Sequence, residues 1–173
     1  MQNLAAYIRN VPDFPVKGIQ FKDITTLIKD GDLFAQTVDQ LYQPFRREEI
    51  EKIVAIEARG FIFGAALSYK LNVGFVPVRK PGKLPAETIS EEYDLEYGKD
   101  SIEMHRDSIL PNEKVLIVDD LLATGGTAAA CCRLVEKLGG NIIGISFLIE
   151  LTEINGRKLL KDYNIQSLLS FPF

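Results

Sequence analysis

Two adjacent carboxylates and a nearby glycine-rich turn are the residues whose types and spacing could do chemistry. Asp119 and Asp120 follow the apolar run Val115–Val118, and Thr124-Gly125-Gly126-Thr127 comes after three intervening residues. The apolar run is typical of a buried strand, and ligands of open α/β sheets bind beyond the carboxyl ends of such strands. A turn of this kind that opens a helix presents free backbone N–H groups at the positive end of the helix dipole. Together with the threonine hydroxyls, these donors predict a phosphate site.

The carboxylates need a different partner, because they would repel a phosphate. They suit the hydroxyl groups of a sugar, or a nearby cation. We therefore interpret Val115–Thr127 as a pocket for a ribose 5-phosphate. The lysine of the Walker P-loop and the dinucleotide fingerprint are both missing from this segment. A Gly-Gly turn is common and paired acids are often solvated, and the interpretation therefore depends on the whole pattern.

Basic residues near two other predicted strand ends could bind a second anionic group. Arg59 follows the apolar run Ile53–Ile56, and its guanidinium is a fork of donors suited to phosphate. The loop 79–85 contains three cations and could close over an anion as a lid. Each of these charges could also be a solvated surface charge. The single histidine, His105, belongs to no motif, and we do not expect it to be catalytic.

Short apolar strands alternate with helices over most of the chain. Such alternation predicts an α/β fold with a mostly parallel sheet flanked by helices. The expected strands are Ile53–Ile56, Phe75–Val78, Lys114–Val118 and Asn141–Leu148. The expected helices are residues 2–9, Asp32–Arg46 (capped by Asp30 or Asp32), Gly60–Leu71, Gly126–Leu138 and Asn155–Lys161. We expect Lys17–Asp23 to be a loop and the residues around Tyr93–Tyr97 to form a small hairpin.

The segment 118–127, Val-Asp-Asp-Leu-Leu-Ala-Thr-Gly-Gly-Thr, resembles the phosphoribosyl-diphosphate signature of the type I phosphoribosyltransferases, in the variant of the members that act on adenine. The resemblance implies that Asp119 and Asp120 hold the ribose hydroxyls. It implies that the 5-phosphate binds to Ala123, Thr124, Gly125, Gly126 and Thr127. The implied reaction is adenine plus 5-phospho-α-D-ribose 1-diphosphate (PRPP) giving AMP and diphosphate, in purine salvage. Mg²⁺ would be the cofactor, held mostly by substrate oxygens and water rather than by protein ligands.

Two other segments resemble parts of the same family that bind diphosphate. The segment around Arg59 resembles the diphosphate loop, and 79–85 resembles a flexible lid. The implied diphosphate-binding residues are Glu57, Ala58, Arg59, Arg79 and Lys83. Whether Arg79 acts in its own site or in that of a neighbouring subunit is left open. Tyr93–Lys99 resembles the second half of the lid, in which Glu96 corresponds to the acid proposed to take the proton of the purine, the one catalytic residue that we expect.

The N-terminal stretch Phe14–Ile24 resembles the adenine-binding hood of the adenine-specific members. Phe21 would stack on the purine, backbone groups of Gln20 and Lys22 would read its edge, and Leu121 would cover its other face. The resemblance spans nearly the whole chain. It implies a type I phosphoribosyltransferase fold that forms a single domain over residues 1–173, with a hood segment at 1–30 and a flexible lid and hairpin at 80–104.

Three alternatives are open. A phosphoribosyltransferase for another base, such as xanthine, hypoxanthine–guanine or orotate, is disfavoured by the hood sequence around Phe21. A transcription regulator that senses PRPP would need an added nucleic-acid-binding element, and the net charge of −4 argues against one. A diphosphokinase that makes PRPP would need a longer chain and an ATP site.

The cysteines and the distribution of apolar residues indicate the compartment in which the chain is expected. Cys131 and Cys132 are adjacent plain thiols, which suggests a reducing compartment. We find no basic, apolar signal sequence at the N-terminus and no apolar run of about 18 residues. We therefore expect a cytoplasmic protein with no membrane and no nucleic-acid partner. The resemblance adds the expectation of a homodimer.

Overall fold

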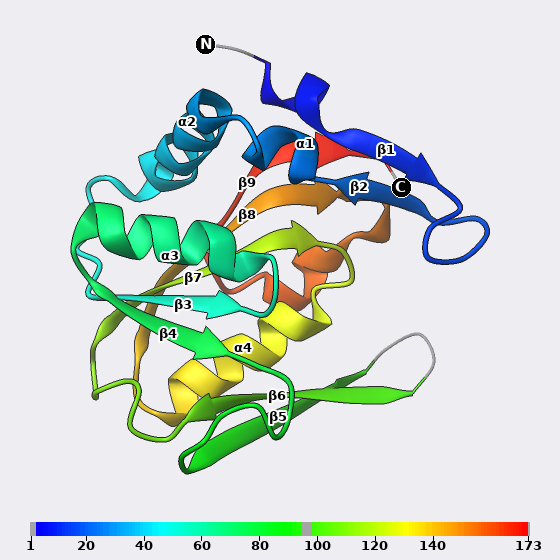
Figure 1. Ribbon diagram of the computed structural model, residues 1–173. Helices are drawn as coiled ribbons and strands as arrows, with labels where there is room; N and C mark the ends of the chain where they lie inside the picture. The colour runs from blue at the N-terminus through cyan, green and yellow to red at the C-terminus, as the bar shows by residue number, and fades with distance from the viewer. Residues whose placement is uncertain (1–2, 95–97, 173) are drawn as a thin grey trace.

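A five-stranded parallel sheet forms the centre of the molecule (Figure 1). The computed structural model describes residues 3–94 and 98–172. The strand order is β4-β3-β7-β8-β9, and every neighbouring pair is parallel. The strands are β3 (Lys52–Ile56), β4 (Gly74–Val78), β7 (Lys114–Leu122), β8 (Asn141–Leu151) and β9 (Ile165–Phe171). The predicted α/β class with a parallel sheet is confirmed.

Helices cover both faces of this sheet (Figure 1). They are α2 (Gly31–Tyr42), α3 (Gly60–Leu71) and α4 (Gly126–Lys137). Side chains of β7 alternate between the faces, as the pleat requires. Leu116 and Val118 pack in the cluster of α2 and α3, while Val115 and Ile117 pack in the cluster of α4. Burial on both faces explains why the strand is continuously apolar up to the two acids.

Short helical turns complete the helical structure. They are η1 (Leu4–Tyr7), α1 (Thr25–Ile28), η2 (Gln43–Phe45), η3 (Thr152–Ile154) and η4 (Gly156–Leu160). The predicted Asp30 cap is present, because its carboxylate accepts the N–H groups of Asp32 and Leu33, each at 3.0 Å. The α-helix ends at Tyr42 rather than at the predicted Arg46, because Pro44 cannot continue it.

Two antiparallel pairs flank the sheet. The first joins β1 (Arg9–Pro12) to β2 (Gln20–Asp23), with Val11 opposite Phe21. The second is the predicted hairpin, β5 (Thr88–Asp94) with β6 (Lys99–His105). The expectation of a loop over Lys17–Asp23 is wrong for Gln20–Asp23, because β1 supplies a strand partner. Figure 1 shows the two pairs above and below the sheet edge toward which β3, β4 and β7 point.

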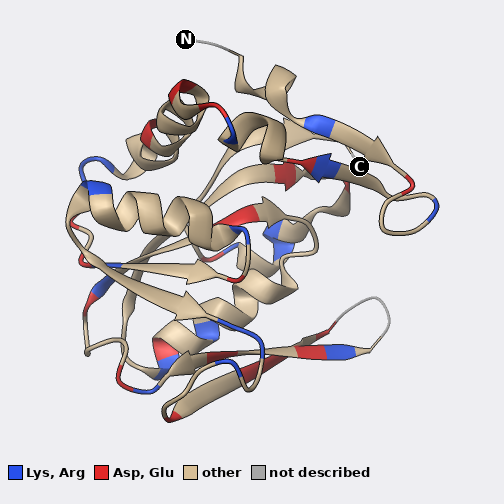
Figure 2. Cartoon of the chain, viewed as in Figure 1, with Lys and Arg blue, Asp and Glu red and all other residues tan. Residues whose placement is uncertain are grey.

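Charged residues are interspersed along the chain rather than gathered on one element (Figure 2). Opposite charges pair across elements, as with Arg133 of α4 and Glu91 of β5 at 2.7 Å. Within the described residues, no helix is long and apolar enough to cross a membrane.

Candidate active site

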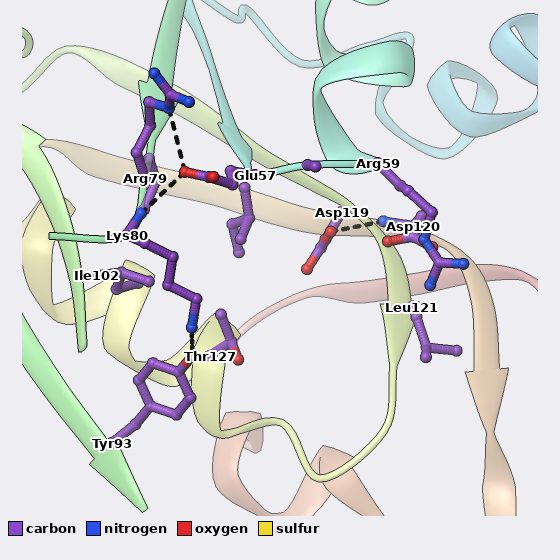
Figure 3. Close-up of a pocket in the computed structure, with 13 residues that line it drawn as sticks. Glu57, Arg59, Arg79, Lys80, Tyr93, Ile102, Asp119, Asp120, Leu121 and Thr127 are labelled. Atoms are coloured by element: carbon purple, nitrogen blue, oxygen red, sulfur yellow. Dashed lines mark hydrogen bonds and ion pairs between the residues drawn. The ribbon is translucent and has the colours of Figure 1, made fainter. Parts of the chain in front are cut away.

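A cavity of about 330 Å³ opens at the carboxyl ends of β3, β4 and β7 (Figure 3). This is the edge of a parallel sheet at which ligands bind. The cavity is lined by Ile56, Glu57, Ala58, Arg59, Val78, Arg79, Lys80, Tyr93, Ile102, Asp119, Asp120, Leu121 and Thr127. Residues from all three segments singled out in the sequence therefore meet in one place.

Asp119 and Asp120 are still part of β7, which extends four residues beyond the predicted end at Val118. The backbone N–H of Asp120 donates to Oδ1 of Asp119 at 2.8 Å. Burial raises the pKa of Asp119 well above its ordinary value, and the neighbouring charge of Asp120 raises it further. Oδ2 of Asp120 is buried, and no described residue donates an aligned hydrogen bond to it. Such an oxygen is an acceptor available to a ligand hydroxyl.

Arg59 lies between these carboxylates and the β1–β2 pair. Its Nε is 2.8 Å from Oδ2 of Asp120, and its guanidinium carbon is 4.9 Å from the centre of the Phe21 ring. The first contact is an ion pair without hydrogen-bond alignment, consistent with the unsatisfied oxygen. Gly60 follows at the start of α3, and a Cβ there would come within 2.9 Å of Oδ1 of Asp119. Glycine therefore allows this helix to begin directly against the acidic pair.

Two cationic side chains, those of Arg79 and Lys83, pair with Glu57 on the opposite wall of the cavity, and Figure 3 shows Glu57 beside Arg79 and the Lys80 backbone. Its carboxylate lies 3.1 Å from Nε of Arg79, pairs with Nζ of Lys83, and accepts the backbone N–H of Lys80 at 3.0 Å. Burial alone would raise the pKa of Glu57, but the hydrogen bonds from Lys83 and the Lys80 amide lower it. The Arg79 guanidinium also donates to the carbonyl oxygen of Lys83 at 3.2 Å. The start of the loop is thus tied to the strand end by an ionised carboxylate.

Lys80 and Tyr93 line the cavity but are absent from the predicted site. Nζ of Lys80 donates to the Tyr93 hydroxyl at 2.7 Å and forms an ion pair with Asp100 of β6. Burial would lower the pKa of Lys80, but the hydrogen bonds with Asp100 and Tyr93 raise it. The run of basic residues at 79–83 was the available signal for Lys80. Tyr93 had no comparable signal, because it is brought in by the pairing of the hairpin.

The glycine-rich loop forms a second hollow of about 190 Å³ beside the first. Asp119, Leu121 and Thr127 line both, so the two hollows adjoin. Ala123, Thr124 and Gly125 line only the second. Gly125 caps α4 with φ of +81°, a conformation that suits glycine. The loop therefore presents the N-terminus of a twelve-residue helix to the hollow.

The β1–β2 pair holds Phe21 close to the cavity through Arg59. Phe14 packs edge-on against Phe21, with ring centres 5.1 Å apart. The side chains of Gln20 and Lys22 both bond to Asn10, at 2.6 and 3.0 Å. These side chains are therefore occupied within the pair, whereas the predicted contacts to a base involve their backbone groups.

Two predictions remain, one for the proton acceptor and one for the magnesium ion. Glu96, predicted to act as the proton acceptor, lies outside the described residues. Among the described residues, no three His, Cys, Asp or Glu side chains gather into a metal-binding set. The cavity offers the paired acids Asp119 and Asp120, a set that suits hydroxyl groups or a cation whose remaining ligands come with a substrate.

Comparisons of the sequence with known proteins agree on one family. The model of the phosphoribosyl transferase domain family matches residues 24–172. Adenine phosphoribosyltransferase of Chloroflexus aurantiacus is 54% identical over 170 residues, which cover 98% of both chains. The Clostridium perfringens enzyme of the same name is 57% identical over 164 residues, 95% of both chains.

Solved structures agree over the whole fold. The crystal structure of adenine phosphoribosyltransferase from Thermoanaerobacter pseudethanolicus superimposes with a TM-score of 0.95 at 56% identity, and covers 97% of this chain and 98% of that one. The Saccharomyces cerevisiae enzyme, solved with an imino-altritol bisphosphate and adenine, gives 0.91 at 40% identity, with 96% of both chains covered. With its sheet, its cavity and these relatives in agreement, the chain belongs to the adenine phosphoribosyltransferases of the type I phosphoribosyltransferase family.

Proposed function

We propose that the cavity between β3, β4 and β7 is the place where this chain joins adenine to phosphoribose. As an adenine phosphoribosyltransferase, the chain transfers the 5-phosphoribosyl group of PRPP to N9 of adenine, giving AMP and diphosphate. The main support for placing the substrate here is Oδ2 of Asp120, which is buried and unsatisfied and lies beside the loop at the N-terminus of α4. An acceptor for hydroxyls next to a cradle of N–H donors matches a ribose 5-phosphate.

The proposed position of the ribose 5-phosphate fixes where the diphosphate of PRPP would bind. With the 5-phosphate on the loop Ala123–Thr127 and the ribose on Asp119 and Asp120, the diphosphate extends toward the cations on the opposite wall. Arg79 and Lys83 neutralise it, together with Arg59 and the backbone of the Glu57–Ala58 segment. The Glu57 carboxylate itself repels diphosphate, and its role is to hold the cations.

Adenine lies on the side of the β1–β2 pair. Phe21 stacks on one face of the base, Leu121 covers the other, and the backbone of Gln20 and Lys22 reads its edge. This placement is supported by Arg59, which contacts both the Phe21 ring and Asp120. The contact brings the β1–β2 pair close to the carboxylates proposed to bind the ribose. In this proposal, recognition of the base edge by backbone groups gives the specificity for adenine.

In the reaction, the bond from C1 of the ribose to the diphosphate oxygen breaks, and the bond from C1 to N9 forms. Diphosphate leaves with the electron pair, and the N9 nitrogen loses its proton, for which Glu96 is the proposed acceptor. Positive charge develops on the ribose, close to Asp119 and Asp120. Fixed charges of this kind stabilise a transition state in a water-poor site.

Magnesium is the proposed cofactor, and it would arrive bound to PRPP. The paired acids fit a cation that keeps most of its ligands from substrate and water. When bound, Mg²⁺ would neutralise diphosphate charge and so ease departure of the leaving group. The chain itself binds, orients and shields the reacting groups.

The chain is proposed to act as one domain, with residues 1–30 as the hood and 80–104 as the lid and hairpin. Lid closure would exclude water, which otherwise competes with adenine for the ribose. A cytoplasmic location is proposed as well, and the two buried free thiols, Cys131 and Cys132, support it because they suit a reducing compartment.

A homodimer is proposed from the exposed side of α3. This helix is apolar on nearly all sides, although one side faces outward: Ala65 is exposed and Tyr69 is 91% exposed. Phe61, one turn before Ala65, packs edge-on against Phe75 at 5.6 Å beside it. A helix that is apolar all round is normally buried, and a second copy of this chain is the partner that would cover it.

A panel of bases tests the proposed function. The purified chain would be supplied with PRPP and Mg²⁺ and with adenine, hypoxanthine, guanine, xanthine or orotate in turn. Rapid formation of AMP with little turnover of the other bases is expected. Strong turnover of hypoxanthine without adenine would overturn the base assignment, and omission of Mg²⁺ with a chelator present should abolish the reaction.

A further inference from the structure

The loop Ala123–Thr127 packs against a second segment of the chain, which begins at Gly156. Gly156, the first residue of η4, is buried against the loop. A Cβ at Gly156 would come within 2.9 Å of both the Gly125 nitrogen and the Thr124 carbonyl carbon, and closer still to the Ala123 oxygen. The contact is reciprocal, because a Cβ at Gly125 would lie 3.2 Å from the Gly156 carbonyl carbon. The two backbones touch, and neither position has room for a side chain.

The residue after Gly156 fastens this segment to the sheet. Arg157 makes two hydrogen bonds of 2.7 Å to the carboxylate of Glu150 on β8. It also donates to the Ile165 carbonyl at 3.2 Å and to the Ser167 hydroxyl at 3.3 Å, both on β9. The bidentate pairing of a guanidinium with a carboxylate is directional and strong. The hydrogen bonds from Arg157 lower the pKa of the buried Glu150, so the pair is ionised at neutral pH.

The position of Glu150 connects this anchor to the loop. Glu150 lies directly opposite Leu122 in the register of β7 and β8, and Leu122 is the residue before Ala123. At the other end of η4, Leu160 is fully buried in the cluster that contains α4. The segment 156–160 is therefore fixed to the sheet on one side and to α4 on the other. The loop lies between these two attachments.

We infer that Gly156 and Arg157 are positioning residues for the 5-phosphate: Arg157 fixes the η4 segment, and the bare backbone of Gly156 holds the loop in the shape that presents its N–H groups. The inference rests on the proposed function, which puts the 5-phosphate on this loop. Neither residue touches the substrate. A loop displaced by even about 1 Å aims its donors poorly, and such shifts cost up to about a hundredfold in rate or affinity.

The test compares two fragments of the substrate. Equilibrium binding of ribose 5-phosphate, and separately of diphosphate with Mg²⁺, would be measured by calorimetry for Gly156→Ala. The dissociation constant for ribose 5-phosphate should rise by at least about tenfold, while that for diphosphate stays within about twofold of wild type. In steady state, KM for PRPP should rise while KM for adenine changes little. A general loss of structure would weaken both fragments.

Gly144→Ala is the matched control. A Cβ there would meet the Asn164 carbonyl oxygen at 2.9 Å and Cε1 of Phe45 closer still, a comparable clash near the start of β8 and away from the loop. Its binding of ribose 5-phosphate should equal that of wild type. The inference is overturned if Gly156→Ala binds ribose 5-phosphate as wild type does, or if the control weakens it equally.

Three further variants keep the outcome decisive. If Gly156→Ala does not fold, Arg157→Met should show the same selective loss, with Arg157→Lys intermediate, because lysine keeps the charge without the fork. Equal binding of ribose 5-phosphate by Arg157→Met and wild type would then overturn the inference. Thr127→Ala separates this inference from the proposed function. If that variant binds ribose 5-phosphate normally, the phosphate site itself is misplaced; if it loses binding while Gly156→Ala does not, only the positioning role fails.

Discussion

Arg59 and Asp120 form an ion pair of 2.8 Å in which the carboxylate oxygen receives no aligned hydrogen bond from any described residue. The arginine keeps the buried charge compensated, while the oxygen still has a free lone pair for a ligand. A buried carboxylate without either feature would be costly, because an unpaired charge in a protein interior is strongly unfavourable. The pair is therefore arranged for a third partner, which we propose to be a ribose hydroxyl.

Replacing Asp120 with asparagine tests that role. The change keeps the shape but removes the charge that accepts the hydroxyl and balances Arg59. Hydrogen bonds to charged groups contribute about 1.5–3 kcal/mol, so kcat/KM for PRPP should fall by about tenfold to a hundredfold. Steady-state kinetics at saturating adenine would measure it, with exposed Asp162→Asn as the charge-matched control. A value within about twofold of wild type would contradict the assignment.

Replacing Glu57 with glutamine probes the cation cluster. The amide oxygen can still accept the Lys80 N–H, but the negative charge that shares Arg79 and Lys83 with diphosphate is gone. Removing one repulsive charge a few ångströms from the ligand should tighten product inhibition by diphosphate by about tenfold. Inhibition constants with PRPP as the varied substrate give the answer. Weaker inhibition would mean that holding the cations in place matters more than the repulsion.

Phe21→Ala should weaken binding of the base alone. Stacking of a base on an aromatic ring contributes about 1–3 kcal/mol, so KM for adenine should rise by about tenfold to a hundredfold. KM for PRPP should change by less than about threefold, because the proposed sugar-phosphate site lies on β7 and α4. The exposed apolar Val16, mutated to alanine, is the control on the same segment. Equal rises in both KM values would show instead that the ring only stabilises the fold.

The lowered pKa of Asp23 predicts a contribution to the free energy of unfolding that is lost in acid. The backbone N–H of Thr25, followed by the Arg9 guanidinium, lowers the pKa of Asp23 from 3.8 to about 2. A lowered carboxyl pKa stabilises the folded state above pH 3.8, and the contribution is lost as the pH falls through about 2. Asp23→Asn should be about 1–2 kcal/mol less stable near neutral pH, and the difference should shrink toward pH 2. Urea unfolding at several pH values measures it; a difference independent of pH would contradict the pKa.

Ala65→Arg tests the proposed homodimer. A long charged side chain on the outward face of α3 would be tolerated in a monomer but would face its own charge or apolar surface across an interface. Sedimentation should show the wild type as a dimer and the variant as a monomer at micromolar concentration. Leu110→Arg, at another exposed apolar position before β7, should leave the dimer intact. A monomeric wild type would remove the proposal altogether.

Local patterns in the sequence predicted the elements nearest the site well. α3 has the predicted bounds, Gly60–Leu71, because the glycine at its start and the apolar run that follows are local signals. The strand β7 was predicted too short, because two acids look like a strand end although Asp120 is buried. β9 was not predicted at all: Ile165–Phe171 is an edge strand of half-buried residues and has no clear burial pattern.

The parts of the site that the sequence did not predict depend on contacts between distant segments. Gln20 to Asp23 became a strand because Arg9–Pro12 pairs with it. Tyr93 reaches the cavity because the hairpin docks there, and Gly156 touches the loop across about thirty residues of chain. Motifs predicted the groups that could meet a substrate, whereas the residues that support those groups required the folded structure.

The β1–β2 pair is a separate hydrogen-bonded sheet, joined to no strand of the central five. In the proposed function, this pair supplies Phe21 and the backbone groups that read the base, while the central sheet binds the sugar-phosphate and adds Leu121 to the base site. Exchanging residues 9–23 for the corresponding segment of another nucleobase enzyme would alter the base that is accepted without remaking the core on which the transfer depends.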